Sequence, residues 1–419
     1  MASRLAALQT DSAPEMDAAE VDMAAPRSVY SDRSCSAAET LRNIAPLLPA
    51  YGITRLARLT DLDTLGIPVW NAVVPNARSI VINQGKGITD TDAKVSAAME
   101  ALERAVAANP QVDRLTTSWN ALAEAGQAAN RLDSLIAVAQ DDIQPGEQLE
   151  WVAGIDLVSG KTTYVPFEAV ALDRTQGGRF WQSSDGLASG NTPEEAVLHG
   201  LLERIERDAY VLWQVISHTQ RQALCIAASS FDDAIIADLE RRIAAAGLKL
   251  CLFDITSDIG VPCYSALLGP ADILALRQLR YPDVTHGSGT HPNPVRAAIR
   301  AITEAAQSRL TFISGARDDI HPSRFSQPLP AETQQCFAAD PMPRPIVPAP
   351  AVSGAAALLA HTLDRLKQVG IDTVIAVALT GQKMPFSVAK ILVPQLENPD
   401  GARKRKFGAR AISRVLQVS

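Results

Sequence analysis

The chain of 419 residues is 47% apolar and 20% charged, which is ordinary for a globular protein with one large body or two to three domains. Its net charge of −7 argues against a general nucleic-acid-binding protein, because no excess of basic residues offsets the repulsion from phosphates. No stretch of about 20 consecutive apolar residues occurs, so we expect no membrane-spanning helix.

The N-terminal segment is acidic, with five carboxylates between positions 11 and 22, and it lacks the basic start and apolar centre of a signal peptide. We expect residues 1–30 to form a disordered tail and residues 31–419 to form one domain. The five cysteines are far apart and include no C-x-x-C pair, a pattern that favours buried thiols over a zinc or disulfide framework. These features predict a cytoplasmic protein.

The first elements in chain order form a strand, a glycine loop and a helix. A helix is predicted over 37–48, and turns near Gly52 and Gly66 lead into strands. A β-branched strand over 79–83 then runs into a loop over 84–87, which an acidic helix follows. Further along the chain, glycine-rich loops over 181–190 and 286–289 also precede helices.

The remaining segments alternate between the two types of secondary structure. The predicted elements are a hairpin over 152–157 and 162–165, a helix over 231–245, strands over 248–255 and 262–268, a proline-rich surface linker over 335–350, a helix over 354–369, and strands over 373–379 and 386–393. Together they predict an α+β (mixed α/β) fold with repeated glycine-loop and helix units around a nucleotide site.

The helices after the first two glycine loops carry the same acidic motif in the same register. Glu100 and Glu103 in the first helix correspond to Glu203 and Glu206 in the second. A looser third copy contains Glu304. The alignment has no gaps, and it also matches Gly87, Thr89, Asp92, Ala93 and Arg104 with Gly190, Thr192, Glu195, Ala196 and Arg207.

This repeat places carboxylates in pairs, because residues three apart project from one face of a helix. Two such pairs that face each other repel strongly unless a cation lies between them, and Mg²⁺ usually shares carboxylates with substrate phosphates. On a solvated helix face the same motif would contribute only about a few tenths of a kcal/mol through glutamate–arginine pairs. Both motifs instead lie among apolar residues, where unpaired carboxylates are costly. The repeat therefore predicts a nucleotide–magnesium enzyme.

Basic residues complete the predicted site. Lys86 lies between two glycines, outside any Walker frame; alone it would indicate an exposed turn, but before a helix it can place a positive charge on a phosphate. Arg300 and Glu304 are four residues apart, so they either form an intrahelical ion pair or contact a phosphate and a metal. His286 and His291 favour structural roles.

These motifs resemble the YcaO family. Residues 85–104 read GKG followed by S-x-x-x-E-x-x-E-R, residues 186–209 read GLASGNTPEEA followed by ERIERDA, and residues 287–309 begin GSGTHPNP and end EAAQSR. The segment over 52–69 resembles the subgroup that works with a TfuA partner. The resemblance covers nearly the whole chain.

The resemblance implies a YcaO fold and ATP-dependent activation of a peptide backbone amide, whose oxygen is phosphorylated with the help of Mg²⁺. A sulfide nucleophile then gives a thioamide, whereas a neighbouring Cys, Ser or Thr side chain gives an azoline. By motif position, the implied nucleotide contacts are Lys86, Ser96, Asn191, Glu195, Arg207 and Arg300. The implied Mg²⁺ ligands are Glu100, Glu103, Glu203, Glu206 and Glu304.

Two departures from the family pattern affect the expected product. Azoline-forming members end in a proline-rich tail, whereas residues 414–419 read RVLQVS, and the usual PGLE reads PQLE at residues 394–397. We therefore expect a thioamide-forming enzyme with a peptide or protein substrate, a TfuA-like partner and a homodimeric state. An azoline-forming cyclodehydratase and a non-catalytic ATP-binding accessory protein are the alternatives. No nucleic-acid or membrane partner is expected.

Overall fold

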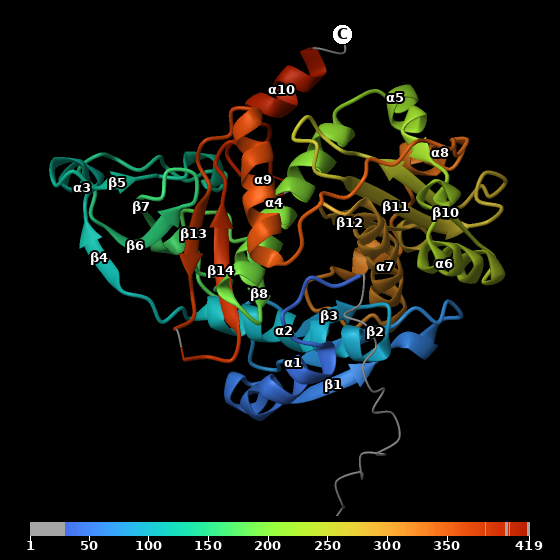
Figure 1. The fold of residues 1–419 in the computed structure, drawn as a ribbon, viewed down its shortest axis with the longest axis horizontal. Coiled ribbons are helices and arrows are strands. Elements are labelled where there is room, and N and C mark those ends of the chain that lie inside the picture. Colours follow the sequence, from blue (N-terminus) through green and yellow to red (C-terminus); the bar gives the residue numbers. More distant parts are fainter. Residues whose placement is uncertain (1–29, 382, 399–400, 402, 417–419) are drawn as a thin grey trace, which may run out of the picture. The chain divides into compact units, whose positions relative to one another are not determined.

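Three β-sheets organise the described part of the chain, which comprises residues 30–381, 383–398, 401 and 403–416 of the computed structural model (Figure 1). The predicted acidic tail lies almost entirely outside these residues. From Asp32 onward the described chain forms one compact unit. Its mixture of helices, antiparallel strands and hairpins confirms the predicted fold class.

The first sheet pairs three antiparallel strands, and helix α2 packs against it. Its third strand differs from the prediction, because the expected loop over 84–87 largely belongs to the strand and Gly85 lies opposite Trp70. A Cβ atom at Gly85 would overlap the backbone nitrogen of Ala97 in α2. The glycine therefore allows the helix to lie directly on the strand. The elements are α1 (Ala37–Ile44), β1 (Arg55–Arg58), β2 (Val69–Val73), β3 (Ile82–Lys86) and α2 (Asp90–Ala108).

The second sheet joins segments that are far apart in the sequence. Its described strands follow the order β5-β7-β6-β13-β14-β8, with β4 paired to β6, and the predicted hairpin is confirmed as β6–β7. Strand β14 lies beside β8, which precedes the second acidic helix α4 (Figure 1). The elements are β4 (Arg114–Thr117), α3 (Trp119–Glu124), β5 (Ala128–Ala129), β6 (Leu149–Asp156), β7 (Thr162–Pro166), β8 (Leu187–Gly190), α4 (Pro193–Gln214), α9 (Ala355–Gln368), β13 (Ile375–Ala378) and β14 (Ser387–Leu392).

The third sheet is antiparallel in the order β12-β11-β10-β9, and helices α6 and α7 pack against it. The predicted loop over 286–289 is part of strand β12. Cβ atoms at Gly287 and Gly289 would overlap the backbone of Ala305 and Ala297 in α7, so these glycines also serve close strand–helix packing. The elements are α5 (His218–Ala223), β9 (Cys225–Ile226), α6 (Ala234–Ala245), β10 (Leu248–Asp254), β11 (Cys263–Pro270), β12 (Thr285–Thr290), α7 (Pro294–Ser314) and α8 (Ala331–Cys336).

The proline-rich segment differs from the linker predicted over 335–350. Its first residues complete helix α8, and Phe337 is fully buried in the core of the third sheet. Further along, the backbone N–H of Met342 donates to Cys225, and its carbonyl accepts from Ala227. A buried aromatic side chain and backbone hydrogen bonds thus tie the segment to the sheet.

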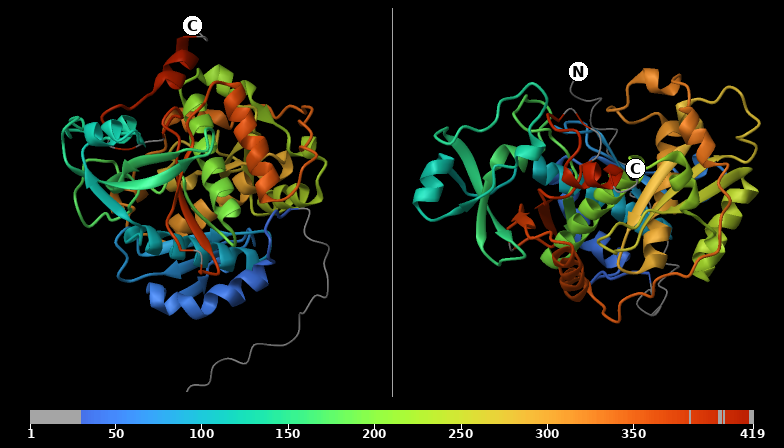
Figure 2. Two further views of the ribbon diagram at one scale, coloured as in Figure 1. Left: turned by 60° about the vertical axis from the view of Figure 1, so that its left-hand side comes forward. Right: turned by 90° about the horizontal axis from the view of Figure 1, so that it is seen from above.

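The last helix, α10 (Ala409–Leu416), is fixed to α4 by buried charges. The carboxylate of Asp208, fully buried in α4, accepts from the Arg410 guanidinium and from the backbone N–H of Glu397. Glu397 in turn accepts the N–H groups of Gly408 and Ala411 at the start of α10. Helix α10 and the first sheet lie at opposite ends of the unit (Figures 1 and 2).

Gln395, which stands where the family pattern has glycine, also has a structural explanation. Its Oε1 accepts the backbone N–H groups of Asp372 and Thr373, and its Nε2 donates to the carbonyl of Gly370. These three bonds fix the turn between α9 and β13. The substitution therefore adds a tether for the strand beside β14.

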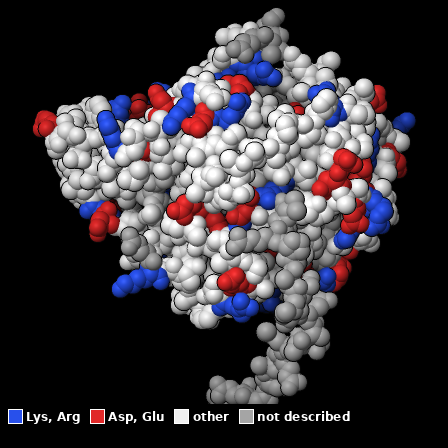
Figure 3. All heavy atoms as spheres, in the orientation of Figure 1, with Lys and Arg blue, Asp and Glu red and all other residues white. Residues whose placement is uncertain are grey.

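The visible surface carries charges of both signs. On the face shown in Figure 3, acidic and basic side chains are interspersed over the described residues, without one continuous basic area. Among the described residues, none of the helices combines the length and the apolar character that a bilayer crossing requires.

We expect Gly85→Ala to lower the free energy of unfolding by about 3 kcal/mol, the upper end of the cost of overpacking, because the added methyl meets helix backbone that cannot rotate away. Chemical denaturation measures this change. Gly146→Ala is the matched control, since no atom lies within 4 Å of its Cβ position. Wild-type stability of Gly85→Ala would mean that the strand and the helix are not in contact at this point.

Candidate functional site

The first acidic pair lies on α2 and faces strands β3 and β8. The carboxylate of Glu100 accepts from Arg104 Nε at 3.2 Å and from the backbone N–H of Gln84 at 3.3 Å. Glu103 is buried and accepts from the Ser189 hydroxyl at 3.2 Å. Burial, together with the negative charge of Glu100, raises the pKa of Glu103 well above its ordinary value.

The second pair lies on α4 and contacts the turn before β8 and the end of β12. Glu203 accepts from the backbone N–H of Gly186 at 3.2 Å and from Arg207 Nη2 at 3.3 Å. Glu206 accepts from the backbone N–H of Thr290 at 3.0 Å, and its carboxylate lies 3.7 Å from Arg207 Nη1. Burial, followed by the negative charge of Glu304, raises the pKa of Glu206 to about 7.

The acid on α7 pairs across the site with the lysine on β3. Glu304 forms an ion pair with Lys86, so it does not depend on Arg300 in its own helix. Burial acts to raise the pKa of Glu304, but the positive charges of Lys86 and Arg207 hold it at about 2. Arg300 contacts His199 of α4 instead, with 3.1 Å between Nη2 and Nε2. Burial and then the charge of Arg300 lower the pKa of His199 well below its ordinary value, so the imidazole is neutral.

Two implied nucleotide contacts lie at the N-terminus of α4. The carboxylate of Glu195 accepts from the backbone N–H of Asn191 at 2.9 Å and from its side-chain amide at 3.0 Å. Burial acts to raise the pKa of Glu195, but backbone N–H groups of Ser34 and Asn191 keep it below its ordinary value. Ser96, another implied contact, lies half-buried on α2, one turn before Glu100.

The residues before α1 reach the same place, although sequence analysis assigned them no role. Arg33 Nη1 donates to Glu195 at 3.1 Å, and the backbone N–H of Ser34 donates to the same carboxylate at 2.6 Å. Asp32 accepts from His291 Nε2 at 2.8 Å and pairs with Arg296 at the start of α7. No motif signals these residues, because their partners follow more than 150 positions later.

A further acid, Asp185, stands one residue before the second recognised stretch and was also missed. Its carboxylate lies 3.6 Å from Arg207 Nε. The predicted acids therefore come together in two sets. One contains Glu100, Glu103 and Glu203 with Asp185, and the other contains Glu206 and Glu304 with Lys86; Arg207 contacts both sets.

The chemistry of these side chains fits a nucleotide with Mg²⁺. Among the described residues no group of three or more His, Cys, Asp or Glu side chains could by itself hold a metal ion. Mg²⁺ however usually takes only one or two carboxylates and completes its shell with phosphate and water oxygens. Buried nitrogen atoms of Arg104, Arg207 and Arg300 lack hydrogen-bond partners among the described residues. The site thus offers donors for phosphates beside acids that a cation would relieve of repulsion.

A comparison with protein families matches residues 84–397 to the model described as YcaO cyclodehydratase, ATP- and Mg²⁺-binding. The chain is 41% identical over 397 residues to an uncharacterised protein in the tfuA 3′ region of Rhizobium leguminosarum bv. trifolii, covering 93% of this chain and 94% of the relative. It is 38% identical over 295 residues to an uncharacterised protein of Methanothermobacter thermautotrophicus, covering 68% and 73%.

Solved structures share the fold. YcaO from Methanopyrus kandleri bound with AMPPCP and Mg²⁺ matches with a TM-score of 0.66 and 22% identity, over 91% of this chain and 98% of that one. A heterocyclase in complex with substrate and cofactor matches with a TM-score of 0.69 and 20% identity, over 87% of this chain. The match spans about half of the heterocyclase, 53% of its length.

The raised pKa of Glu206 predicts a pH-dependent stability. Between the ordinary carboxyl pKa of 4.5 and about 7, the folded protein keeps a proton that the unfolded chain has lost, so stability falls as pH rises through this window. Glu206→Gln removes this loss, and we expect it to stabilise the metal-free protein at pH 8 by on the order of 2 kcal/mol.

Thermal unfolding of wild type and variant between pH 5 and pH 8 checks this expectation. The exposed Glu240 of α6 supplies the control variant Glu240→Gln, which should follow the wild-type curve. If the melting temperatures of Glu206→Gln and wild type change with pH in parallel, ionisation of Glu206 does not destabilise the folded protein and the expectation is wrong.

Proposed function

Because the chain belongs to the YcaO family, we propose that it uses ATP and Mg²⁺ to activate a backbone amide of a peptide or protein and that the product is a thioamide. The observation that carries the proposal is the placement of five glutamates from three helices in two sets that Arg207 contacts, with Lys86 and Arg300 near the second set. Phosphoryl transfer needs positioning and charge neutralisation of this kind more than it needs a nucleophile from the protein.

In this proposal the basic and amide side chains hold the nucleotide and the acids hold the cation. Lys86, Arg207 and Arg300 would contact phosphates, and Ser96, Asn191 and Glu195 would complete the nucleotide contacts. The cation ligands would come from Glu100, Glu103, Glu203, Glu206 and Glu304. Bound Mg²⁺ supplies neutralisation of phosphate charge. Burial of the acids keeps bulk water away from the reacting groups, which strengthens every electrostatic interaction there.

The sulfur for a thioamide would come from outside this chain. Burial raises the pKa of Cys225 to about 11 and that of Cys251 to about 12, so these thiols stay protonated at neutral pH and are poor nucleophiles. The relative in the tfuA 3′ region supports a TfuA-like protein as the partner, with delivery of sulfide as a role to test. A homodimeric state and a cytoplasmic location remain predictions.

An azoline-forming cyclodehydratase is the second candidate, and the family description favours it. It needs no external sulfur, because a side chain of the substrate attacks the activated amide. A non-catalytic accessory protein is the third candidate, and the buried acids disfavour it. Glu103 and Glu206 lie at sites that raise their pKa values. A protein that serves only as a scaffold has no use for such costly buried acids.

Nucleotide binding should require the cation. We expect calorimetry to detect binding of a non-hydrolysable ATP analogue in Mg²⁺ and to lose it in excess chelator, because the acids repel phosphates unless a cation intervenes. Arg300→Ala should weaken binding by about 1.5–3 kcal/mol, the value of a hydrogen bond to a charged group, whereas the exposed Arg277→Ala should not. Equal affinity in chelator would refute the proposed role of the glutamates.

The mass of the product distinguishes the two chemistries. The assay combines the protein, a TfuA-like partner, ATP, Mg²⁺, sulfide and the cognate peptide, and we expect a product heavier by the difference between sulfur and oxygen. Glu203→Gln, nearly isosteric, should abolish product formation while leaving the fold intact. A product lighter by one water would assign the protein to the azoline-forming class.

A further inference from the structure

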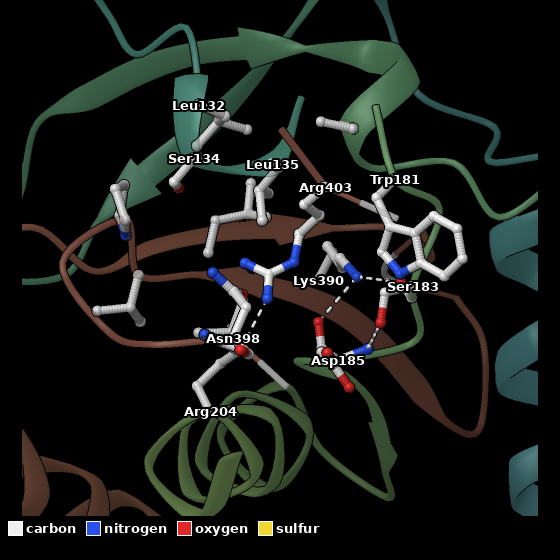
Figure 4. Close-up of a pocket in the computed structure, with 15 residues that line it drawn as sticks. Leu132, Ser134, Leu135, Trp181, Ser183, Asp185, Arg204, Lys390, Asn398 and Arg403 are labelled. Atoms are coloured by element: carbon white, nitrogen blue, oxygen red, sulfur yellow. Dashed lines mark hydrogen bonds between the residues drawn. The ribbon is translucent and has the colours of Figure 1, made fainter. Parts of the chain in front are cut away.

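A buried lysine outside the recognised motifs lies beside the first set of acids. Lys390 lies on β14 and is only 4% exposed. Its Nζ donates to the carbonyl of Ser183 at 2.7 Å and to that of Asp185 at 2.8 Å (Figure 4). Burying an ammonium group is costly unless its donors and charge are used. Here two of its three donors hold a single turn, residues 183–186.

That turn touches the proposed nucleotide–Mg²⁺ site at three points. The backbone N–H of Gly186 donates to Glu203, and the carboxylate of Asp185 lies 3.6 Å from Arg207. Ser184 accepts from Arg104 Nη2 at 3.1 Å. The turn therefore connects both acidic helices, and its position sets where the Glu203 carboxylate and the Arg207 guanidinium point.

Strand β14 also holds the turn through its backbone. The N–H of Ile391 donates to the carbonyl of Gly186 at 2.7 Å, and a Cβ atom at Gly186 would overlap the Ile391 carbonyl. Gly186 has a φ of +75°, which favours glycine. Lys390 and its neighbour on the same strand thus fix the beginning and the end of the turn.

The charges around Lys390 agree with this placement. Burial lowers the pKa of Lys390 to about 8, while the nearby carboxylates of Asp185 and Glu203 favour its charged form. Lys390 therefore adds positive charge beside the first set of acids while its donors bind backbone carbonyls, whereas Lys86 pairs directly with Glu304.

From these contacts we propose that Lys390 is a positioning residue of the nucleotide–Mg²⁺ site. It holds the turn over 183–186 and thereby orients Glu203 toward the cation and Arg207 toward phosphate. The inference rests on the proposed function, since it concerns the same site. Outer groups that orient metal ligands typically contribute roughly 10–100-fold to metal affinity.

The test measures how much Mg²⁺ is needed for half-maximal binding of the ATP analogue AMPPCP, together with the melting temperature. We expect Lys390→Met to raise that Mg²⁺ concentration by roughly tenfold or more. Lys390→Arg should restore most of the affinity, because it keeps the charge and the donors, and a cavity of about 30 Å³ beside Lys390 offers room for the larger group.

Lys249→Met is the matched control. Lys249 on β10 is half-buried and donates to the carbonyl of Phe337 at 2.8 Å, so its loss removes a similar bond away from the acids. It should lower the melting temperature without changing the Mg²⁺ requirement. An unchanged requirement in Lys390→Met, or an equal rise in both variants, overturns the inference.

A double-mutant cycle tests the route through the turn. If Lys390 acts by placing Asp185, the double variant Lys390→Met/Asp185→Asn should lose less affinity than the sum of the losses in the two single variants. A loss in the double variant equal to that sum refutes the route. If Lys390→Met does not fold, Lys390→Gln takes its place in every comparison. Failure of the wild type to bind AMPPCP with Mg²⁺ would instead refute the proposed function, so the two failures are distinguishable.

Discussion

Three helices bury carboxylates beside one another, and the structure depends on positive charges that offset the negative charge of these groups. Glu103, Glu203 and Glu206 all have pKa values raised by burial, so each is a cost to the folded state. Arg104 and Arg207 on the same helices offset part of this charge. Two strands add lysines: Lys86 extends from β3 and Lys390 from β14. The strands on which the helices pack thus add positive charge to that of the helix arginines.

The acids themselves could be predicted from the sequence, because helical periodicity is a local property. Glu100 and Glu103 lie on one helix as the motif required, and the same holds for Glu203 and Glu206. The glycines before them were misinterpreted as loops. Glycine is equally suited to a phosphate-binding loop and to a close strand–helix contact. For Gly85 only the adjacent backbone of Ala97 in α2 shows that the glycine makes a strand–helix contact.

The missed residues share a different property, the distance between partners along the chain. Arg33 and Glu195 are 162 positions apart, and Lys390 and Asp185 are 205 apart. The residues next to Arg33 or Lys390 in the sequence do not indicate such a contact. The acids could be found because the two acidic helices align with each other. An ion pair of Arg300 with Glu304 was one of two alternatives from the sequence, and Glu304 instead pairs with a distant residue, because Lys86 reaches it from the first sheet.

Both ends of the described chain contact helix α4, which carries Glu203 and Glu206. Each residue turns an α-helix by about 100°, so a small rotation of α4 would aim Glu203 and Glu206 away from their partners. Arg33 and Ser34 hold Glu195 in its first turn, and Arg410 holds Asp208 further along. Between them, Arg204 donates to the Glu397 carbonyl at 2.7 Å. Three polar contacts on one helix therefore prevent its rotation and keep the orientation that the paired carboxylates require.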